Sequence, residues 1–468
     1  MTIVSKGIIF VKRKGVEVKD LLVVLVMVVL GFSQINWEVE IVDSVPGAPY
    51  DFYFNSLALD TCRVAHIVYN KNEFEKVIYA SRVDTGWQKE TVDSGSSVFY
   101  GFSLIFDSDN IPHLSYYRGD DNTDKTYLCY ARRGNADWQI EAVDSSTGSL
   151  GNYFWDFNSS IDLDTLGSPG VAYIAWNVDD SLHYIKYAHY NGTDWDTSVV
   201  EYDSAYANIQ TAPTDFSPSL RFDSRNIPHI AFYHAYPLYD SDTLKIAYYD
   251  DSSSRWIVSP VLCNIGAGIS ISLALNSQDY PYIAHGVDIG LYCTWWDGVF
   301  WNQEYTGDDI GWLNIRIVID LDNLDNPHIF YHPTGPVEYC YKDSVWHLCG
   351  RVDSTLDNLG DISLAIDNVD QPHVSFRFSD WDSIHQDNFA GLKYAKGTFV
   401  SVDEEEVTEI ETGTFREIIF SGPLHLPEGK ECRVFDIIGR VVTPDKIRPG
   451  VYFVEIDGEI TKKVVKIR

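Results

Sequence analysis

The feature that most constrains this chain is a repeat that recurs seven times over most of its length. A Trp, a short alternating run and an Asp-Ser pair recur as WEVEIVDS at Trp37, WQKETVDS at Trp87 and WQIEAVDS at Trp138, and more loosely at Trp195, Trp256, Trp301 and Trp346. A Ser-led run and an acidic turn follow, as in SLIFDSDNIPHLSYY at 103–117. Successive turn residues lie 45 to 59 residues apart, close to the length of a four-stranded propeller blade. These aligned residues are Asp60, Asp107, Asp164, Asp223, Asn276, Asp322 and Asp367.

The residues between these markers predict strands throughout. β-Branched and aromatic residues fill the runs, turn-forming residues separate them, and no helical period interrupts the pattern. The sequence therefore predicts an all-β fold in which residues 34–401 form a seven-bladed β-propeller with four-stranded blades. A β-sandwich array is the main alternative, but a sandwich does not require the same Trp, Asp and Pro in every unit.

The phase of the repeat predicts how the ring closes. We call the Ser-led strand A, the Pro-led strand that follows it B, the next strand C and the Trp-led strand D. The first D strand, at about Ile35 to Asp43, has no A, B or C strand before it, whereas the last unit, 362–396, has no clear D strand after it. We therefore expect the N-terminal strand to complete the seventh blade, which removes the exposed edges that an open array of blades would have.

Composition excludes several classes of protein. Hydrophobic residues make up 45% and aromatic residues 14% of the 468 residues, which supports a large core and argues against disorder. Lys and Arg total 35 against 68 Asp and Glu, giving a net charge of −33. This is the wrong sign for a surface that neutralises phosphates, so we expect no nucleic-acid partner.

The N-terminus has the pattern of a secretory signal peptide. Basic residues precede a short apolar run at 21–32, and Gly31 and Ser33 supply small side chains for cleavage after Ser33. No Cys stands directly after the run, which argues against a lipid anchor on the mature N-terminus, and no later segment has 18 consecutive apolar residues. We expect residues 1–33 to be removed and the mature protein, without a transmembrane segment, to be secreted or held at the cell surface.

The seven cysteines do not form an evident framework. Their number is odd, they are widely spaced, and none has zinc-type spacing. Cys129 and Cys293 lie in strand-like runs, where they are expected to be small buried side chains. Cys340 lies in a similar run but also flanks a predicted hairpin turn together with Cys349, where a disulfide could form in an oxidising compartment.

One face of the predicted ring combines aromatic and acidic loops. Because the strands alternate in direction, the D-to-A and B-to-C loops emerge on the same face. Exposed aromatic rings beside carboxylates suit stacking on sugars, or capture of a cationic peptide or a metal ion. Alternatively, the aromatic rings pack beneath their own loops and the Asp residues form solvated turns. The candidate ligand-binding residues, expected to be solvent-accessible, are Tyr100, Tyr153, Trp155, Trp312 and Trp381.

Two further repeated residues have a structural interpretation. A His follows the Pro position in five copies, whereas Gly170 and Tyr282 replace it in the other two, so a ring of metal ligands would be broken. The aligned Asp is expected to accept backbone N–H bonds in its turn. We therefore assign no metal site and no cofactor, while Ca²⁺ stays possible on the acidic loops.

Enzyme motifs are mostly absent from the ring. The sequence contains no GxSxG, HExxH, Walker or GxGxxG motif in the required setting. The repeat resembles the Asp-box propellers of the sialidases, but the S-x-D-x-G-x-T-W box is not present and no Arg triad can be assigned. No catalytic residue is therefore named. A carboxylate pair for glycoside hydrolysis stays open, because its separation depends on loop geometry.

Composition changes abruptly after Val402. Residues 402–412 include the acidic run DEEEVTEIE and predict a linker, and residues 413–468 contain strand-like runs with 10 Lys or Arg against 8 Asp or Glu. This segment predicts a separate small β-sandwich.

The C-terminal segment resembles the type A C-terminal sorting domain of the type IX secretion system. The resemblance rests on VFDIIGRVV (434–442), PGVYFVEI (449–456) and the terminal KKVVKIR. It implies recognition by the outer-membrane translocon, followed by release or surface attachment. The residues that match the family's pattern are Asp436, Gly439, Arg440, Gly450, Tyr452, Lys462 and Lys463.

Taken together, the sequence predicts an exported propeller that binds an extracellular glycan or protein and has the translocon as a second partner. The alternative is a carbohydrate-active propeller enzyme with glycosidase or lyase activity. A passive adhesion module is a third possibility.

Overall fold

A computed structural model describes residues 34–400 and 416–466 with internal gaps, and divides the chain into two compact units, Met1–Ser401 and Val402–Arg468. The predicted signal peptide and the acidic linker lie outside the described residues. Within the described part, no helix is long and apolar enough to cross a membrane. The gaps are 47–50, 73, 96–97, 121–124, 136, 148–157, 178–181, 204–217, 235–242, 264–269, 288–289, 311–315, 334, 355–359, 383–386, 421–431, 437–439, 445–446, 448–449 and 457–458.

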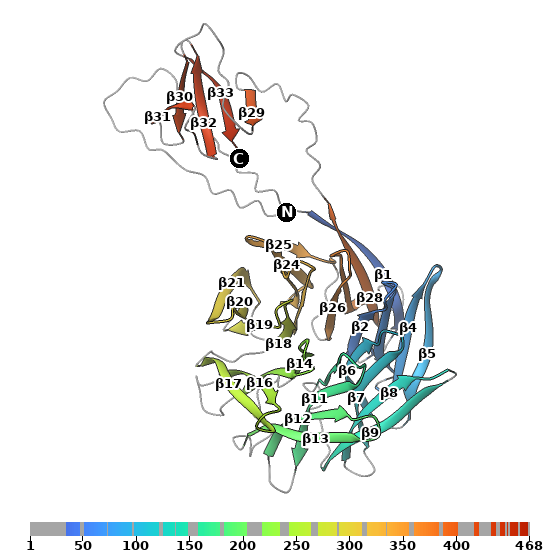
Figure 1. Ribbon diagram of the computed structural model, residues 1–468. Helices are drawn as coiled ribbons and strands as arrows, with labels where there is room; N and C mark the ends of the chain where they lie inside the picture. Colours follow the sequence, from blue (N-terminus) through green and yellow to red (C-terminus); the bar gives the residue numbers. More distant parts are fainter. Residues whose placement is uncertain are drawn as a thin grey trace. The chain divides into compact units, whose positions relative to one another are not determined.

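The first unit consists of seven antiparallel blades arranged around one axis (Figure 1). The first three are β2 (Asn55–Leu59), β3 (Ala65–Lys71), β4 (Lys76–Val83) and β5 (Gly86–Ser94); β6 (Val98–Phe106), β7 (Pro112–Asp120), β8 (Lys125–Arg133) and β9 (Trp138–Thr147); and β10 (Ser160–Leu163), β11 (Pro169–Asn177), β12 (Leu182–Tyr190) and β13 (Trp195–Asp203). A single parallel bridge between Asn177 and Thr147 joins the second and third blades into one sheet.

The remaining four blades repeat the same order. They are β14 (Ser219–Phe222), β15 (Pro228–His234), β16 (Thr243–Asp250) and β17 (Arg255–Cys263); β18 (Ile271–Leu275), β19 (Pro281–Val287), β20 (Gly290–Trp296) and β21 (Trp301–Asp309); β22 (Arg316–Leu321), β23 (Pro327–His332), β24 (Glu338–Lys342) and β25 (Trp346–Arg351); and β26 (Ile362–Ile366), β27 (Pro372–Asp382), β28 (Asp387–Val400) and β1 (Gln34–Pro46). The predicted all-β, seven-bladed fold is confirmed.

The ring is closed at two levels. The innermost strands contact one another in the order β2, β6, β10, β14, β18, β22, β26 and back to β2. The N-terminal strand β1 pairs antiparallel with β28 from Gln34↔Val400 to Pro46↔Phe389, so the two ends of the ring sequence share the seventh blade. The predicted closure is therefore confirmed, and β28 presents no open edge.

The repeated Trp fixes each blade against the preceding one. Trp138 at the start of β9 meets Tyr79 of β4 edge-on at 5.2 Å, and Trp195 of β13 meets Tyr130 of β8 at 5.1 Å. Trp37 of β1 meets Tyr339 of β24 in the same way at 5.3 Å. Such aromatic pairs add to the free energy of burial. Trp87 on Tyr394 and Trp256 on Tyr187 make the same contact, so in the described residues it recurs at five of the seven blade interfaces.

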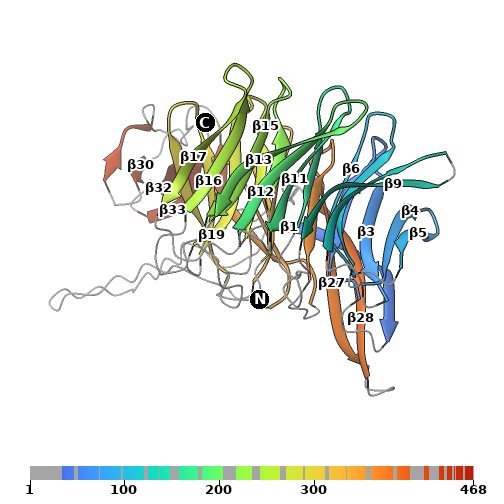
Figure 2. The ribbon, with the colours of Figure 1, turned by 90° about the horizontal axis from the view of Figure 1, so that it is seen from below.

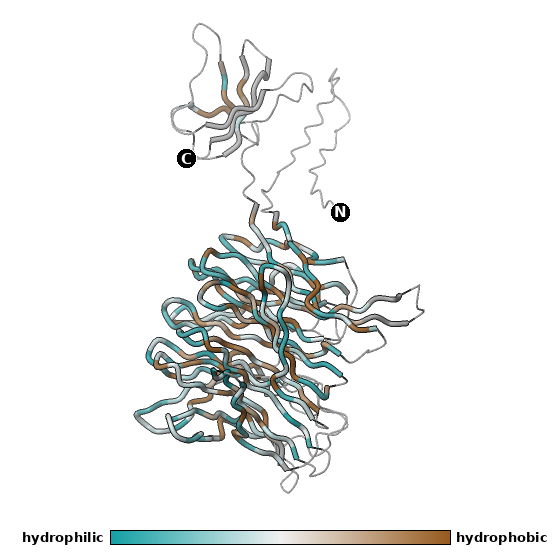
Figure 3. The backbone as a smooth tube through the Cα atoms, turned by 90° about the vertical axis from the view of Figure 1, so that its right-hand side faces the viewer, coloured by the Kyte–Doolittle hydropathy of each residue, from teal (hydrophilic) through white to brown (hydrophobic). Residues whose placement is uncertain are grey.

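The repeated Asp near the end of strand D makes a polar contact with the following blade. Tyr69 of β3 donates its hydroxyl to Asp43 of β1 at 2.8 Å, and Tyr116 of β7 donates to Asp93 of β5 at 2.7 Å. Apolar strand residues fill the space between these contacts, and in Figure 3 hydrophobic stretches run through the strands while many turns are hydrophilic. Viewed from the side, the blades stand next to one another with hairpin turns at their ends (Figure 2).

The second unit contains one five-stranded sheet in its described residues, where the sequence predicted a small sandwich. The order is β29-β33-β32-β30-β31, and the last strand, β33, pairs parallel with β29 and antiparallel with β32. Val434, Tyr452 and Val454 form part of its small core. The strands are β29 (Arg416–Phe420), β30 (Cys432–Asp436), β31 (Val441–Val442), β32 (Gly450–Ile456) and β33 (Glu459–Lys466).

Candidate functional site

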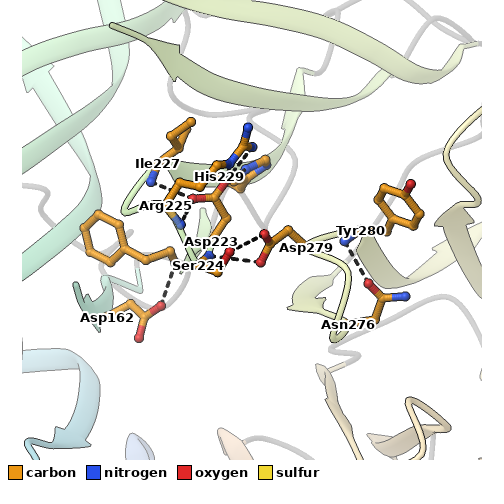
Figure 4. A network of polar contacts seen from close by, with 10 residues as sticks. Asp162, Asp223, Ser224, Arg225, Ile227, His229, Asn276, Asp279 and Tyr280 are labelled. Atoms are coloured by element: carbon orange, nitrogen blue, oxygen red, sulfur yellow. Dashed lines mark hydrogen bonds and ion pairs between the residues drawn. The ribbon is translucent and has the colours of Figure 1, made fainter. Parts of the chain in front are cut away.

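The polar groups of the A-to-B turns form hydrogen bonds within the turns themselves. In the fourth blade, Asp223 Oδ1 accepts the backbone N–H groups of Arg225 at 2.9 Å and Ile227 at 2.8 Å (Figure 4). The equivalent Asp or Asn accepts the same two N–H groups in the other six blades. The aligned Asp residues therefore form turns, as the sequence analysis expected.

These turns are also linked from blade to blade. Ser224 donates its backbone N–H to Asp279 of the next turn at 2.9 Å, as Figure 4 shows. Ser277 donates in the same way to Asp325 at 2.8 Å. The acceptors Asp279 and Asp325 have φ values of 64° and 63°, a region that Asp and Asn tolerate better than most residues. The A-to-B side of the ring therefore has a hydrogen-bonded inner rim that leaves these turn groups satisfied.

The repeated His connects this turn to strand C. In the seventh blade, His373 Nε2 lies 3.3 Å from Asp367 Oδ2, and its Nδ1 lies 2.6 Å from the Tyr394 hydroxyl. In the third blade Gly170 has no side chain, and His189 from strand C lies 3.3 Å from Asp164 instead. The structural interpretation of the repeated His therefore agrees with the geometry. Within the described residues, no group of three or more His, Cys, Asp or Glu is arranged to hold a metal ion.

A polar cavity of about 430 Å³ follows the axis of the ring, and all seven innermost strands line it. Strand A is the inner edge of each blade, so its N–H groups need acceptors from outside the sheet. Ser56 accepts the N–H of Leu104, and Ser103 accepts the N–H of Ile161, at 3.0 and 3.1 Å. The repeated Ser thus satisfies the inner edge of the next blade.

The end of the cavity nearest the D-to-A loops contains an ion pair and an amide. Arg316 donates from Nε to Asp361 at 2.9 Å, and the Asn158 side chain also hydrogen-bonds the Asp361 carboxyl. Burial raises the pKa of Asp361, while the charge of Arg316 opposes this shift. The Oδ1 atom of Asn158 is buried and has no hydrogen-bond partner among the described residues. This cluster can offer donors and acceptors to a polar ligand.

The other end of the cavity contains two further carboxylates. Asp162 accepts the N–H of Phe222 at 2.7 Å, and Asp320 accepts the N–H of Ile366 at 2.8 Å. Burial raises the pKa of both carboxyl groups, and the charge of Arg221 opposes the shift in each. Since both carboxylates bridge neighbouring blades, a structural role accounts for them.

The predicted aromatic platform is only partly described, and one of its members is misplaced. Tyr100 is 2% exposed and stacks on Tyr117 with ring centroids 5.3 Å apart. The predicted solvent exposure of Tyr100 is wrong, because Tyr100 belongs to strand β6 and its aromatic side chain is buried in the core. Phe52 and Phe54 of an equivalent loop are also fully buried. For these residues the alternative interpretation, packing beneath their own loops, is correct.

The other candidate aromatic residues are not described in full. Tyr153, Trp155 and Trp312 lie outside the described residues, and Trp381 lies near the end of β27 without a described side chain. Among the acidic B-to-C residues, Asp120 is half-buried at the end of β7, opposite Lys125. The predicted exposure of these four aromatic residues therefore stays a prediction.

The sorting-motif residues lie on several strands of the second unit. Asp436 at the end of β30 pairs with Tyr452 of β32, and Tyr452 is 9% exposed. Arg440 is exposed between β30 and β31. Gly450 begins β32, Lys462 and Lys463 lie in β33, and Gly439 is outside the described residues.

All seven cysteines are free thiols in the structure. Cys129, Cys293 and Cys340 are fully buried, as expected of small apolar strand residues. Burial raises the pKa of the Cys129 thiol to about 12. The suggested Cys340–Cys349 disulfide is therefore absent from this structure.

Sequence reasoning did not identify the axial cluster of Asn158, Arg316 and Asp361. All three stand six positions before the aligned turn residue of their blades, at the start of the inner strand. Ser270 and Phe54 hold the same position in other blades. A comparison of this one position across the seven copies of the repeat would have shown Arg316 and Asp361, two charged residues, at the start of inner strands.

No family model matches the sequence, and no curated protein is significantly similar to it. Among solved structures, an α-L-arabinanase from Penicillium chrysogenum has a TM-score of 0.42 and 9% identity over 62% of this chain and 92% of that one. Polysaccharide lyase Uly1 has a TM-score of 0.41 and 10% identity over 76% and 91%. The β-propeller domain of the Trilobed protease from Pyrococcus furiosus has a TM-score of 0.40 and 7% identity over 76% and 99%. These distant similarities concern the fold alone.

Proposed function

We propose that this protein is an exported glycan-binding propeller and that a neutral saccharide enters the axial cavity from its D-to-A end. The observation that carries the proposal is the unpartnered Asn158 Oδ1 beside the Arg316–Asp361 pair. A buried acceptor without a donor is costly, and a sugar hydroxyl can supply that donor. The cavity volume of about 430 Å³ lies within the range of small-molecule sites.

The charge of the cavity favours a neutral ligand. Asp162, Asp320 and Asp361 line it together with Arg221 and Arg316, which leaves an excess of negative charge. Each Arg faces a carboxylate, as in the ion pair of Arg316 with Asp361. The negative charge of the cavity would repel an acidic polysaccharide, and the two Arg residues already face carboxylates of the protein.

Export is the second part of the proposal. The signal-peptide pattern at 1–33 and the sorting-domain resemblance at 413–468 support transport to the cell exterior through a type IX translocon. The division of the chain into two compact units is consistent with a separate sorting domain. The ring would then meet its glycan as a surface-attached or released protein.

A glycan array tests the binding proposal. The mature chain should bind a set of neutral glycans, and Asn158→Ala should weaken binding by about tenfold, the loss expected for one or two hydrogen bonds. The matched control is Asn36→Ala, which removes an exposed amide of β1 outside the cavity lining and should leave the array profile unchanged. Wild-type protein that binds no glycan, or Asn158→Ala that binds as tightly as wild type, would contradict the proposal.

A carbohydrate-active enzyme is the second candidate. The observation in its favour is that three carboxyl groups, those of Asp162, Asp320 and Asp361, line one cavity, since most glycosidases use a pair of carboxyl groups. Incubating the glycans bound on the array with the protein and analysing the products separates the two functions. Intact glycans support binding alone, whereas cleavage that Asp361→Asn abolishes supports catalysis.

A further inference from the structure

The opposite face of the ring has an uneven distribution of apolar side chains. The A-to-B and C-to-D turns emerge there, and three consecutive blades place five large apolar side chains at the tips of these turns. We call them the apolar turn patch: Val299 (63% exposed), Phe300 (69%), Leu324 (78%), Val345 (57%) and Val369 (51%). In the second, fourth and fifth blades the tip position of the A-to-B turn holds Asp109, Arg225 and Gln278, whereas the third blade carries an isolated exposed Leu166.

Hydrogen bonds hold the turns of this patch together. Ser277 of the fifth blade donates its backbone N–H and its hydroxyl to Asp325, at 2.8 and 2.6 Å. Asn323, next to Leu324, donates its N–H to Asp370 of the seventh blade at 2.9 Å. Since Val369 directly precedes Asp370, these bonds fix the tips of neighbouring blades in one surface.

The C-to-D turn of the fifth blade is joined to this rim. A Cβ atom at Gly298 would lie 2.7 Å from the Tyr280 hydroxyl, so the turn that carries Val299 and Phe300 packs on the A-to-B turn of its own blade. The apolar side chains are therefore presented by a preformed support. A rigid apolar surface loses little conformational entropy when a partner binds.

The charges around the patch define what it can accept. The five turns, 276–280, 297–300, 322–326, 343–345 and 367–371, contain seven Asp, of which Asp367 is buried, and no Lys or Arg. Hydrogen bonds from backbone N–H groups lower the pKa of the exposed Asp343 to about 2 and also lower the pKa of Asp297, so both carboxylates stay charged at neutral pH. A partner must bring apolar side chains together with positive charge.

We infer that the apolar turn patch docks a protein partner through a basic amphipathic segment, with its apolar side chains on Phe300 and Leu324 and its Lys or Arg side chains against the surrounding aspartates. This site is separate from the saccharide cavity of the proposed function. A second copy of the chain would bring the same acidic turns and a net charge of −33, so self-association through this face is disfavoured. An anionic membrane surface is disfavoured for the same reason.

Fluorescence polarisation with a labelled amphipathic helical peptide of Leu and Lys tests the inference. The mature wild-type chain should bind this peptide, and the double variant Phe300→Ser/Leu324→Ser should bind it at least about tenfold more weakly, as expected when two central apolar contacts are lost. The matched control is Leu166→Ser, which removes a single 84% exposed leucine from an A-to-B turn outside the patch. That variant should change the affinity by less than about twofold.

Several results would overturn the inference. A Gly/Lys peptide that binds as tightly as the Leu/Lys peptide would show attraction by charge alone, and a Leu/Glu peptide of equal affinity would show that charge plays no part. Loss of binding in Leu166→Ser would show that the patch is not the site. Sedimentation of wild-type protein with zwitterionic phosphatidylcholine vesicles, or its dimerisation in a way that Phe300→Ser abolishes, would assign the surface to a membrane or to a second copy. Because the mutated side chains are exposed, equal thermal unfolding of all variants verifies that they are folded.

Discussion

Acid should destabilise the ring through buried histidines, and His373 allows the effect to be measured. His373 is 1% exposed and lies between the Asp367 carboxylate and the Tyr394 hydroxyl. The geometry suits the neutral ring, in which Nε2–H donates to Asp367 and Nδ1 accepts from Tyr394. Burial lowers the pKa of His373 to about 4, although the hydrogen bond to Asp367 opposes the shift.

The size of the effect follows from the two pKa values. The pKa of His373 is 6.5 when the side chain is unperturbed and about 4 in the folded chain. A difference of roughly 2.5 units corresponds to about 3 kcal/mol. Between these values the unfolded chain binds a proton that the folded chain does not, so stability is complete above pH 6.5 and falls as the pH decreases to 4.

The substitution His373→Gln removes the titration but keeps a polar side chain. Urea unfolding followed by Trp fluorescence should show that the variant is less stable than wild type at pH 7.5. The difference between the two proteins should shrink by about 3 kcal/mol at pH 4, because only the wild type loses this contribution. A difference that is equal at both pH values would refute the reasoning. His113→Gln, at the same position of the second blade, provides an independent variant if the first does not fold.

Four further outcomes are expected. Deleting residues 34–45 should abolish cooperative unfolding, because it removes most of the strand that pairs with β28, and an unchanged melting curve would show that the ring does not need this closure. Trp195→Ala should lower the free energy of unfolding by about 2 kcal/mol, since it removes a half-buried indole from its contact with Tyr130, and denaturant titration would measure this. EDTA should change the melting temperature by less than about 1 °C, because the carboxylates of the turn Asp residues already accept hydrogen bonds from backbone N–H groups. A larger fall would reveal a structural Ca²⁺. In a host that has the translocon, truncation after Val402 should leave a folded ring in the periplasm. Residues 403–468 fused to an exported reporter should bring the reporter to the cell surface. Normal export of the truncated protein would contradict a sorting role for these residues.

The fold could be predicted from the sequence because each repeated residue performs the same task in most or all of the blades. The Trp packs on the preceding blade, as Trp138 does on Tyr79, and the Asp closes the A-to-B turn, as Asp223 does. Both tasks depend on geometry that is the same around the ring. They therefore appear at a fixed spacing, and their phase also predicted the closure by β1.

The candidate site could not be predicted in the same way. Asn158 stands in the third blade, whereas Arg316 and Asp361 stand in the sixth and seventh, and only the ring arrangement of the blades brings the three residues to one end of the axis. Tyr100 shows the opposite problem. Its position in a loop predicted exposure to solvent. Burial of its aromatic ring is favourable, however, and the backbone places the ring in the core, where it stacks on Tyr117.

The most direct test of the proposed function is a crystal structure of the mature protein soaked with the neutral saccharide that binds most tightly on the array. The proposal predicts electron density for the sugar in the axial cavity, with a hydroxyl group donating to Asn158 Oδ1 and further hydroxyls at Arg316 or Asp361. Density for the sugar at the apolar turn patch, or a cavity that stays free of sugar at saturating concentration, would contradict it.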